Sequence, residues 1–344
     1  MIRNENRRGD IRDRRWLIPV LILAVLGTAA VSVCVGSYPI SLEQVVQILT
    51  GQMGQTTCRR VFWTLRVPRT VMALAAGGAL GLAGGIYQCV FRNQLASPDL
   101  TGVASGASLG AACAIVLGAS GSQIMGASFV SGLMCLGMVL ILVKLSGGEH
   151  TGSYVLSGIV VSSAANAGLM LLKYMADPER ELAAIEFWTM GSLSAVTSCS
   201  LLPSLWAVVI PMVLLLCMGR QTVILAMGSD HARMLGLHPG LWSVILLCLS
   251  TLMVAGVVSV TGVIAFVGLI APHIAYRLYR RRSGGYFAVC ILTGSVILLG
   301  SDILARLLLG GGELPLSILT VAFSVPVLVV LLWRMREGGD GYGF

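Results

Sequence analysis

Apolar stretches of about 20 residues alternate with short polar segments along almost the whole chain. Each stretch is long enough to cross the roughly 30 Å hydrocarbon layer of a membrane as a helix. The longest, Leu241 to Tyr279, is too long for one crossing and divides at the polar turn Ser259–Gly262. The pattern predicts an all-α integral membrane protein of about ten closely packed transmembrane helices, with nine or eleven as alternatives. The expected spans are about 16–36, 70–90, 100–118, 124–145, 154–175, 201–219, 242–260, 262–279, 286–309 and 315–334.

Glycine recurs at every fourth position in two of the predicted helices, so each series falls on one helix face. The two series are Gly77, Gly81, Gly85 and Gly102, Gly106, Gly110. Small residues at this spacing let two helix backbones approach closely in lipid. The segment from Arg66 to Gly110 is therefore predicted to be membrane-embedded and tightly packed.

The composition excludes a soluble protein. Hydrophobic residues make up 56% of the 344 residues and charged residues 11%, whereas soluble domains carry roughly 25% charged residues. The net charge of +8 could indicate a nucleic-acid partner, but no basic stripe interleaved with aromatic residues occurs, so none is expected. The nine cysteines form no C-x-x-C pair and no Cys/His ligand spacing. We therefore expect small buried thiols and no metal site.

The basic residues indicate how the helices are oriented, because cytoplasmic loops are enriched in Lys and Arg. With the N-terminus inside, 16 of the 23 basic residues fall on the cytoplasmic side, which favours ten spans with both termini cytoplasmic. The chain then divides into a cytosolic basic tail at 1–15, a single transmembrane domain at 16–336 with a cytosolic loop at 219–240, and a cytosolic tail at 337–344. The basic residues expected outside are Arg59, Arg60, Arg66, Arg69, Lys173, Arg180 and Arg306.

Four motifs in a fixed order give the chain a family resemblance from about residue 16 to residue 334. They are RVPRT at 66–70, FRNQLASP at 91–98 with Gly102, GVIAFVGL at 262–269 with Pro272 and His273, and DILAR at 302–306 followed by ELP at 313–315. With these motifs the chain resembles the FecCD family, the permease subunits of ABC importers for iron-siderophores, haem and cobalamin. Gln94 departs from the family pattern, which usually has proline at that position.

The resemblance implies a permease subunit that forms the translocation pathway of an ATP-driven importer in the bacterial inner (plasma) membrane. A ferric-siderophore complex is the expected cargo, with haem or cobalamin as alternatives. No G-x-x-x-x-G-K-[ST] sequence occurs, so ATP and Mg²⁺ are expected on a partner subunit and no cofactor on this chain. The implied partners are a second permease subunit, identical or paralogous, two ATP-binding subunits, an extracytoplasmic substrate-binding protein and the lipid bilayer.

The resemblance also implies roles for particular residues. It assigns Arg66, Arg69 and Arg306 to docking of the substrate-binding protein, because arginine suits bidentate recognition of carboxylates. The alternative for these arginines is that they anchor helix ends, or that Arg306 pairs with Asp302 four residues earlier.

Two further groups follow from the resemblance. The segment expected to contact the ATPase comprises Gly228, Ser229, Asp230, His231, Ala232, Arg233, Met234, Leu235, Gly236 and Leu237, of which Ala232, Met234, Leu235 and Leu237 would give apolar contact. The gate and pathway residues expected are Asn93, Leu95, Thr151, Gly152, Ser157, Ser162 and Asn166. Serine and asparagine in a membrane helix also serve as interhelical hydrogen-bonding groups, which is the alternative for the last three.

Two other classes of protein compete with an ABC permease. An ion-coupled secondary transporter places ionisable groups near the membrane midplane, whereas the charges here cluster at predicted span ends, with Asp302 nearest an interior position. An intramembrane enzyme needs a catalytic dyad at matching depth, and the sequence shows none. His273 is expected to be a packing residue and not a ligand.

Overall fold

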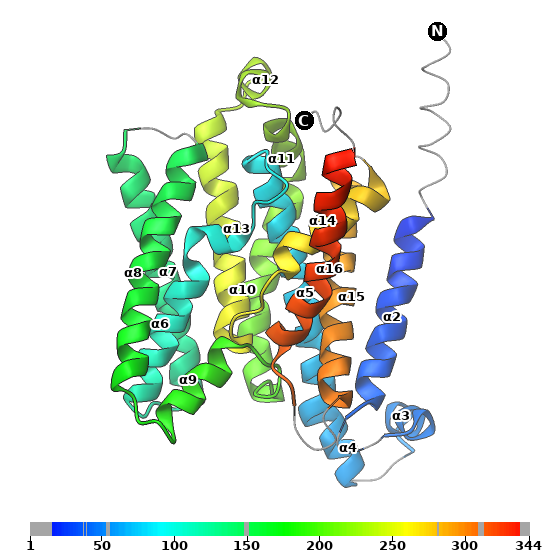
Figure 1. The fold of residues 1–344 in the computed structure, drawn as a ribbon. Helices are drawn as coiled ribbons and strands as arrows, with labels where there is room; N and C mark the ends of the chain where they lie inside the picture. The colour runs from blue at the N-terminus through cyan, green and yellow to red at the C-terminus, as the bar shows by residue number, and fades with distance from the viewer. Residues whose placement is uncertain are drawn as a thin grey trace.

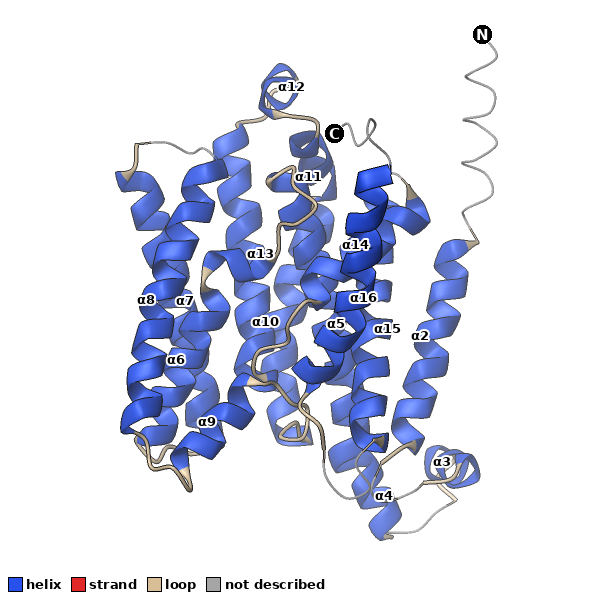
Figure 2. Ribbon diagram, in the orientation of Figure 1, coloured by secondary structure: helices blue, strands red, loops and turns tan. Residues whose placement is uncertain are grey.

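The computed structural model describes residues 16–36, 38, 40–52, 56–147, 151–280, 282–308 and 313–337. Over these residues all regular structure is helical (Figure 2). The predicted tails, 1–15 and all but Glu337 of 337–344, lie outside the described residues, as does His150, which directly precedes the predicted gate residues Thr151 and Gly152.

Each of the ten predicted spans contains a helix, and the helix bounds agree with the predicted ones to within a few residues. These helices are α2 (Leu17–Cys34), α5 (Val67–Val90), α6 (Val103–Val116), α7 (Gly121–Leu145), α8 (Thr151–Met175), α10 (Ser198–Cys217), α13 (Pro239–Thr261), α14 (Val267–Tyr279), α15 (Gly284–Leu307) and α16 (Leu316–Glu337). Over the described residues, seven helical segments are long and apolar enough to span a membrane: α2, α4 to α5 as one, α7, α8, α10, α13 and α15.

Two of the remaining helices, α6 and α14, have only about two-thirds of the length of a crossing. They have 14 and 13 residues, or roughly 20 Å at 1.5 Å per residue. α6 follows a short 3-10 helix and α14 follows a non-helical segment, and each begins after a residue with positive φ, Gly102 at 72° and Phe266 at 65°. The sequence predicted two full spans here, and the structure shows two interrupted crossings.

The connections contain short helices. At one end of the molecule, called here the α4 end, lie α3 (Leu42–Leu49), α4 (Thr57–Val61) and α9 (Glu181–Thr189) (Figure 1). At the opposite end, called the α12 end, lies α12 (Ser229–Met234), which follows α11 (Gly219–Ala226). The first residue of α2 and the last turn of α16 also lie at the α12 end (Figure 1).

Helix α5 forms the centre of the bundle and packs on α13, α14 and α15. A Cβ added at Gly77 would collide with the carbonyl group of Gly294, and one added at Gly81 with that of Cys290. Likewise a Cβ at Gly84 would overlap the carbonyl oxygen of Gly268. The close helix approach predicted from the glycine spacing is therefore present, because α5 touches α14 and α15 through backbone atoms.

Candidate functional site

Three arginines predicted to act together meet at the α4 end, although they are far apart in the sequence. Arg66 ends η1 (Phe62–Arg66), a single turn of π-helix, Arg69 lies in the first turn of α5, and Arg306 lies in the last turn of α15. Because α5 and α15 are antiparallel neighbours held by their glycines, these helix ends are side by side. We call these residues, with Asp302 and Glu313, the arginine cluster.

Asp302 is the centre of the arginine cluster and is completely buried. Its Oδ1 accepts from Arg69 Nε at 2.9 Å, and Arg69 Nη2 lies 2.8 Å from the same oxygen. Its Oδ2 lies 2.7 Å from Arg306 Nη2. One carboxylate thus pairs with two guanidinium groups, and a second carboxylate, that of Glu313, lies 2.6 Å from Arg69 Nη1.

Arg306 also holds the end of α2. Its Nη1 donates to the carbonyl of Ser32 at 2.8 Å, and its Nη2 donates to the hydroxyl of Ser32 at 2.8 Å. The last carbonyl groups of a helix lack intrahelical donors, so Arg306 satisfies one of them. The i,i+4 pair with Asp302 and the anchoring of a helix end are therefore both observed, and neither excludes docking.

Arg66 differs from the other two arginines because one nitrogen of its guanidinium group makes no hydrogen bond among the described residues. Its Nη2 donates to the carbonyl of Tyr38 at 2.9 Å, whereas its buried Nη1 has no hydrogen-bond partner over the described residues. The three arginines and Glu313 line a cavity of about 240 Å³. Three guanidinium groups against two carboxylates leave one net positive charge there, which suits an incoming carboxylate.

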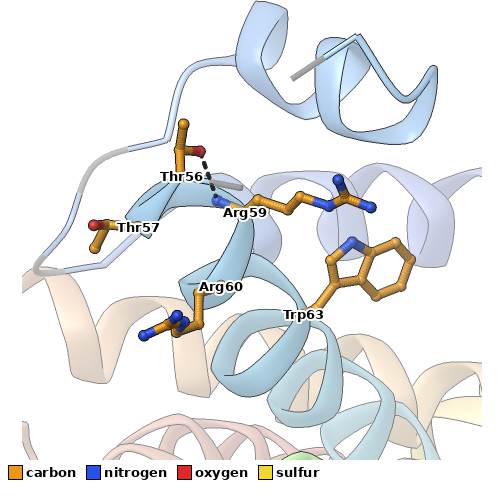
Figure 3. A pocket seen from close by; sticks show the side chains of 5 residues that line it. All are labelled: Thr56, Thr57, Arg59, Arg60 and Trp63. Carbon is orange, nitrogen blue, oxygen red and sulfur yellow. Dashed lines mark hydrogen bonds between the residues drawn. The ribbon is translucent and has the colours of Figure 1, made fainter. Parts of the chain in front are cut away.

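Further basic groups surround a neighbouring cavity at the same end. It has a volume of about 360 Å³ and is lined by Thr56, Thr57, Arg59, Arg60 and Trp63 (Figure 3). The Thr56 hydroxyl accepts from the backbone N–H of Arg59 at 3.4 Å and begins α4. The charge count of the sequence placed Arg59 and Arg60 on this side but assigned them no role.

The predicted ATPase-contacting segment, Gly228 to Leu237, lies at the opposite end and contains α12 (Figure 1). Met234 is 83% exposed and Leu235 60% exposed, as a contact surface requires. Ser229, Asp230, His231, Arg233 and Gly236 are also exposed, and Leu237 is half-buried. Ala232 is different: it is completely buried, so it anchors α12 to its own chain and cannot give the apolar contact that was predicted. Gly228 is buried as well.

The interrupted crossing before α6 turns back into the bundle. After α5 the chain forms an open turn, and η2 (Pro98–Thr101) then lies between α8 and α13. The hydroxyl of Tyr87 is 2.7 Å from that of Thr251 in the middle of α13, and it donates to that of Thr101 at 3.4 Å. Thr101 in turn donates to the carbonyl of Pro98 at 2.8 Å. These buried polar groups hold η2 inside the bundle.

The structure brings three of the seven predicted pathway residues, Asn93, Leu95 and Ser162, to this region. Asn93 and Leu95 are exposed in the turn after α5, and the side-chain oxygen of Asn93 accepts from the backbone N–H of Leu95 at 2.9 Å. Ser162 of α8 contacts Gly102. Gly152 and Asn166 are exposed, and only the backbone of Thr151 is described. Ser157 is buried at 7% exposure, and its place on the pathway stays a prediction.

Two features of these sites were missed from the sequence. The link of Arg69 to Asp302 and Glu313 joins residues more than 230 positions apart, and no local signal predicts it. Asp99 is an exposed carboxylate in η2 inside the bundle, whereas its place directly before the predicted span 100–118 put it at a span end. Its signal was available as an acidic residue between Pro98 and that span.

These features define the class of protein. The apolar helices make the chain a multi-pass membrane protein, and interrupted helices that bring polar groups inside the bundle are typical of transport proteins. The sequence model of the FecCD transport family matches residues 21–334, and the chain belongs to this family. It is a permease of the ABC importer type, located in the bacterial inner membrane.

Individual relatives agree with this assignment. The chain is 31% identical to the vitamin B12 import system permease protein BtuC of Klebsiella pneumoniae, over 95% of this chain and 96% of that protein. It is also 31% identical to the molybdate import system permease protein MolB of Haemophilus influenzae, over 93% and 96%. A solved structure described as "An inward-facing conformation of a putative metal-chelate type ABC transporter" superposes with a TM-score of 0.83 at 28% identity, over 92% of this chain and 99% of that one.

Proposed function

We propose that this chain is one permease subunit of an importer that moves a ferric-siderophore complex inward at the expense of ATP hydrolysed by separate subunits. Two permease subunits would enclose the pathway, and ATP binding would shift them between outward- and inward-facing states. The observation that carries the proposal is the separation of two surfaces. A cavity with excess positive charge lies at the α4 end, and exposed apolar side chains of α12 lie at the other end.

The orientation in the membrane follows from the charge distribution. The α12 end is cytoplasmic in this proposal, because most basic residues belong to that side. The α4 end then faces outward, where a substrate-binding protein delivers the cargo. This assignment puts the ATP-binding subunits at α12 and the receptor at the arginine cluster.

The choice of cargo has mixed support. The structural neighbour is described as a metal-chelate type transporter, which agrees with a ferric siderophore. Relatives that import vitamin B12 and molybdate have similar identity to this chain, so cobalamin fits equally and haem is a further alternative.

The function is tested by uptake into proteoliposomes. We expect the permease, assembled with its ATP-binding subunits and its substrate-binding protein, to accumulate a ferric siderophore only with ATP and Mg²⁺. A variant of the ATPase that cannot hydrolyse ATP serves as the control. Uptake driven by an ion gradient without ATP would refute the proposal, and ATP-driven uptake of cobalamin or haem instead would correct the cargo alone.

Docking at the arginine cluster is best tested at Arg66. Reversing the charge of Arg69 would place a third carboxylate against Asp302 and would test folding instead. We expect Arg66→Gln to weaken binding of the substrate-binding protein about ten-fold or more, since a hydrogen bond to a charged group contributes about 1.5–3 kcal/mol. Arg180→Gln, which alters an exposed arginine on the same side, is the matched control. Equal receptor affinities of the two variants, measured in nanodiscs, would contradict docking at Arg66.

Contact with the ATPase is tested at the exposed residues of α12. We expect Met234→Glu with Leu235→Glu to weaken retention of the ATP-binding subunits about ten-fold or more, because a few buried apolar anchors dominate such interfaces. Leu145→Glu changes an exposed leucine at the end of α7 and should leave retention unchanged. Co-purification and titration of the ATPase subunit measure both. Full retention by the double variant would exclude α12 as the contact.

A further inference from the structure

Asp99 lies deep inside the bundle although it is a charged residue. It belongs to η2, where Leu100 packs on Gly158 of α8, and Ser162, one turn further on, contacts Gly102. Gly158 is seven residues from the first residue of α8, or roughly 10 Å along the helix axis. The neighbouring Pro98 contacts Gly268 at the start of α14. The two interrupted crossings therefore meet beside Asp99.

The carboxylate of Asp99 is open to its surroundings. Asp99 is exposed, whereas Pro98 and Thr101 in the same short helix are buried. The hydroxyl of Ser97 donates to its Oδ2 at 3.5 Å, which is a long hydrogen bond. Among the described residues no cation lies within ion-pairing distance of it. Asp99 is thus a deep carboxylate whose charge the described part of its own chain leaves uncompensated.

An exposed charge at this depth faces lipid, a partner subunit or water. Facing lipid costs up to about 2.5–3.5 kcal/mol, the insertion-scale value at a helix centre, and burial of an unpaired carboxylate against a partner costs several kcal/mol. Non-helical backbone at membrane depth occurs where it is buried in protein or lines a water-filled cavity. The adjacent polar positions Ser162 and Asn166, which lie one turn apart on α8, also favour water. Asp99 therefore faces the pathway.

We propose that Asp99 makes the pathway selective for charge, so that it favours neutral or cationic cargo and disfavours anionic chelates and oxyanions. The proposal rests on the proposed function, because it assigns Asp99 to the translocation pathway of the importer. With two permease subunits around one pathway, each copy contributes such a carboxylate if both carry it. The carboxylates act through their field on whatever passes, and not as ligands of a metal.

The size of the effect follows from Coulomb's law. A unit charge at about 5 Å in water changes the local concentration of a monovalent ion by about four-fold. A cationic and an anionic probe of the same size should therefore differ by about ten-fold in their access to a thiol beside Asp99. This ratio is measurable without knowledge of the natural cargo.

The test measures that ratio at an introduced cysteine. Ser97→Cys puts a thiol next to Asp99, and Leu95→Cys, in the exposed turn before it, is a second site. The exposed Cys199 and Cys217 are replaced by serine, and the same protein without an introduced thiol is the blank. The full chain, assembled with its ATP-binding subunits in nanodiscs, reacts with a cationic and an anionic methanethiosulfonate in parallel. Each rate is divided by that of a free thiol.

We expect the cationic reagent to react about ten-fold faster, and Asp99→Asn to reduce this ratio to near one. Leu145→Cys at the exposed end of α7, outside the proposed ATPase contact, is the control, and its ratio should not change with Asp99→Asn. A ratio at residues 95 and 97 that stays the same when Asp99 is replaced by asparagine would overturn the proposal, as would thiols at both sites that no water-soluble reagent reaches. A failure of ATP-driven uptake would refute the proposed function and leave this readout unaffected.

Discussion

Asp302→Asn is expected to reduce the folding stability of this protein by about 3–5 kcal/mol, because it leaves two buried arginines without their shared counter-charge. The side chain of Asp302 is 0% exposed and lies within 2.9 Å of nitrogens of both Arg69 and Arg306. Asparagine keeps the size and one acceptor oxygen but removes the negative charge. The stability of the detergent-solubilised permease, followed by thermal or denaturant-induced unfolding, measures the loss.

Glu186→Gln is the matched control for Asp302→Asn. Glu186 pairs with Lys173 at 2.9 Å, but its side chain is 43% exposed, and exposed pairs contribute about 0–1 kcal/mol. The two variants remove the same charge from a buried and from an exposed ion pair. Similar stabilities of both variants would mean that water reaches Asp302 and that the arginine cluster does not hold α2, α5 and α15 together.

The place of the long apolar helices could be predicted from the sequence because membrane burial is a local property. An apolar stretch of about 20 residues predicts a spanning helix and is also the segment that forms it. Helices α7, α8, α10 and α13 therefore lie where the hydropathy pattern predicts them. The glycines of α5 were also predicted to mediate close packing, and Gly77 and Gly81 do so.

The interrupted crossings could not be predicted in this way. The stretch that contains α6 is as apolar as the spanning helices, and the stretch that contains α14 continues the apolar run from Leu241. What divides them is backbone conformation at Gly102 and Phe266, together with hydrogen bonds to distant helices. The hydroxyl groups of Tyr87 and Thr251 are in contact although the two residues are 164 positions apart. A hydropathy pattern cannot predict such a contact.

At the arginine cluster, too, contacts between residues distant in the sequence could not be predicted. The sequence predicted that Arg66, Arg69 and Arg306 share one face, and the structure brings them together at the α4 end. The i,i+4 pair of Asp302 with Arg306 was one alternative from the sequence, but no local pattern indicated that the same carboxylate also pairs with Arg69. A docking role for these arginines is still a proposal, and Arg66 is the residue with a donor to spare.

Gly294→Ala is expected to be the most damaging single-methyl change in α15, with a loss of about 1–3 kcal/mol or more from overpacking. A Cβ at residue 294 would overlap the carbonyl oxygen of Gly77 and lie about 3.2 Å from Gly81 Cα. Neither neighbour is a flexible side chain, so the strain can be relieved only if the α5 and α15 backbones separate. The folded fraction after detergent extraction and its unfolding midpoint measure the effect.

Gly300→Ala in the same helix supplies the control, because nothing lies within 4 Å of the position of its Cβ. Alanine there should be neutral or stabilising by roughly 0.5–1 kcal/mol, since it favours the helix over the unfolded chain. The two substitutions add the same methyl group to one helix, six residues apart, and differ only in what faces it. If both variants behaved alike, the approach of α5 to α15 would be adjustable, and the glycine spacing would not be what fixes the arginine cluster at its end.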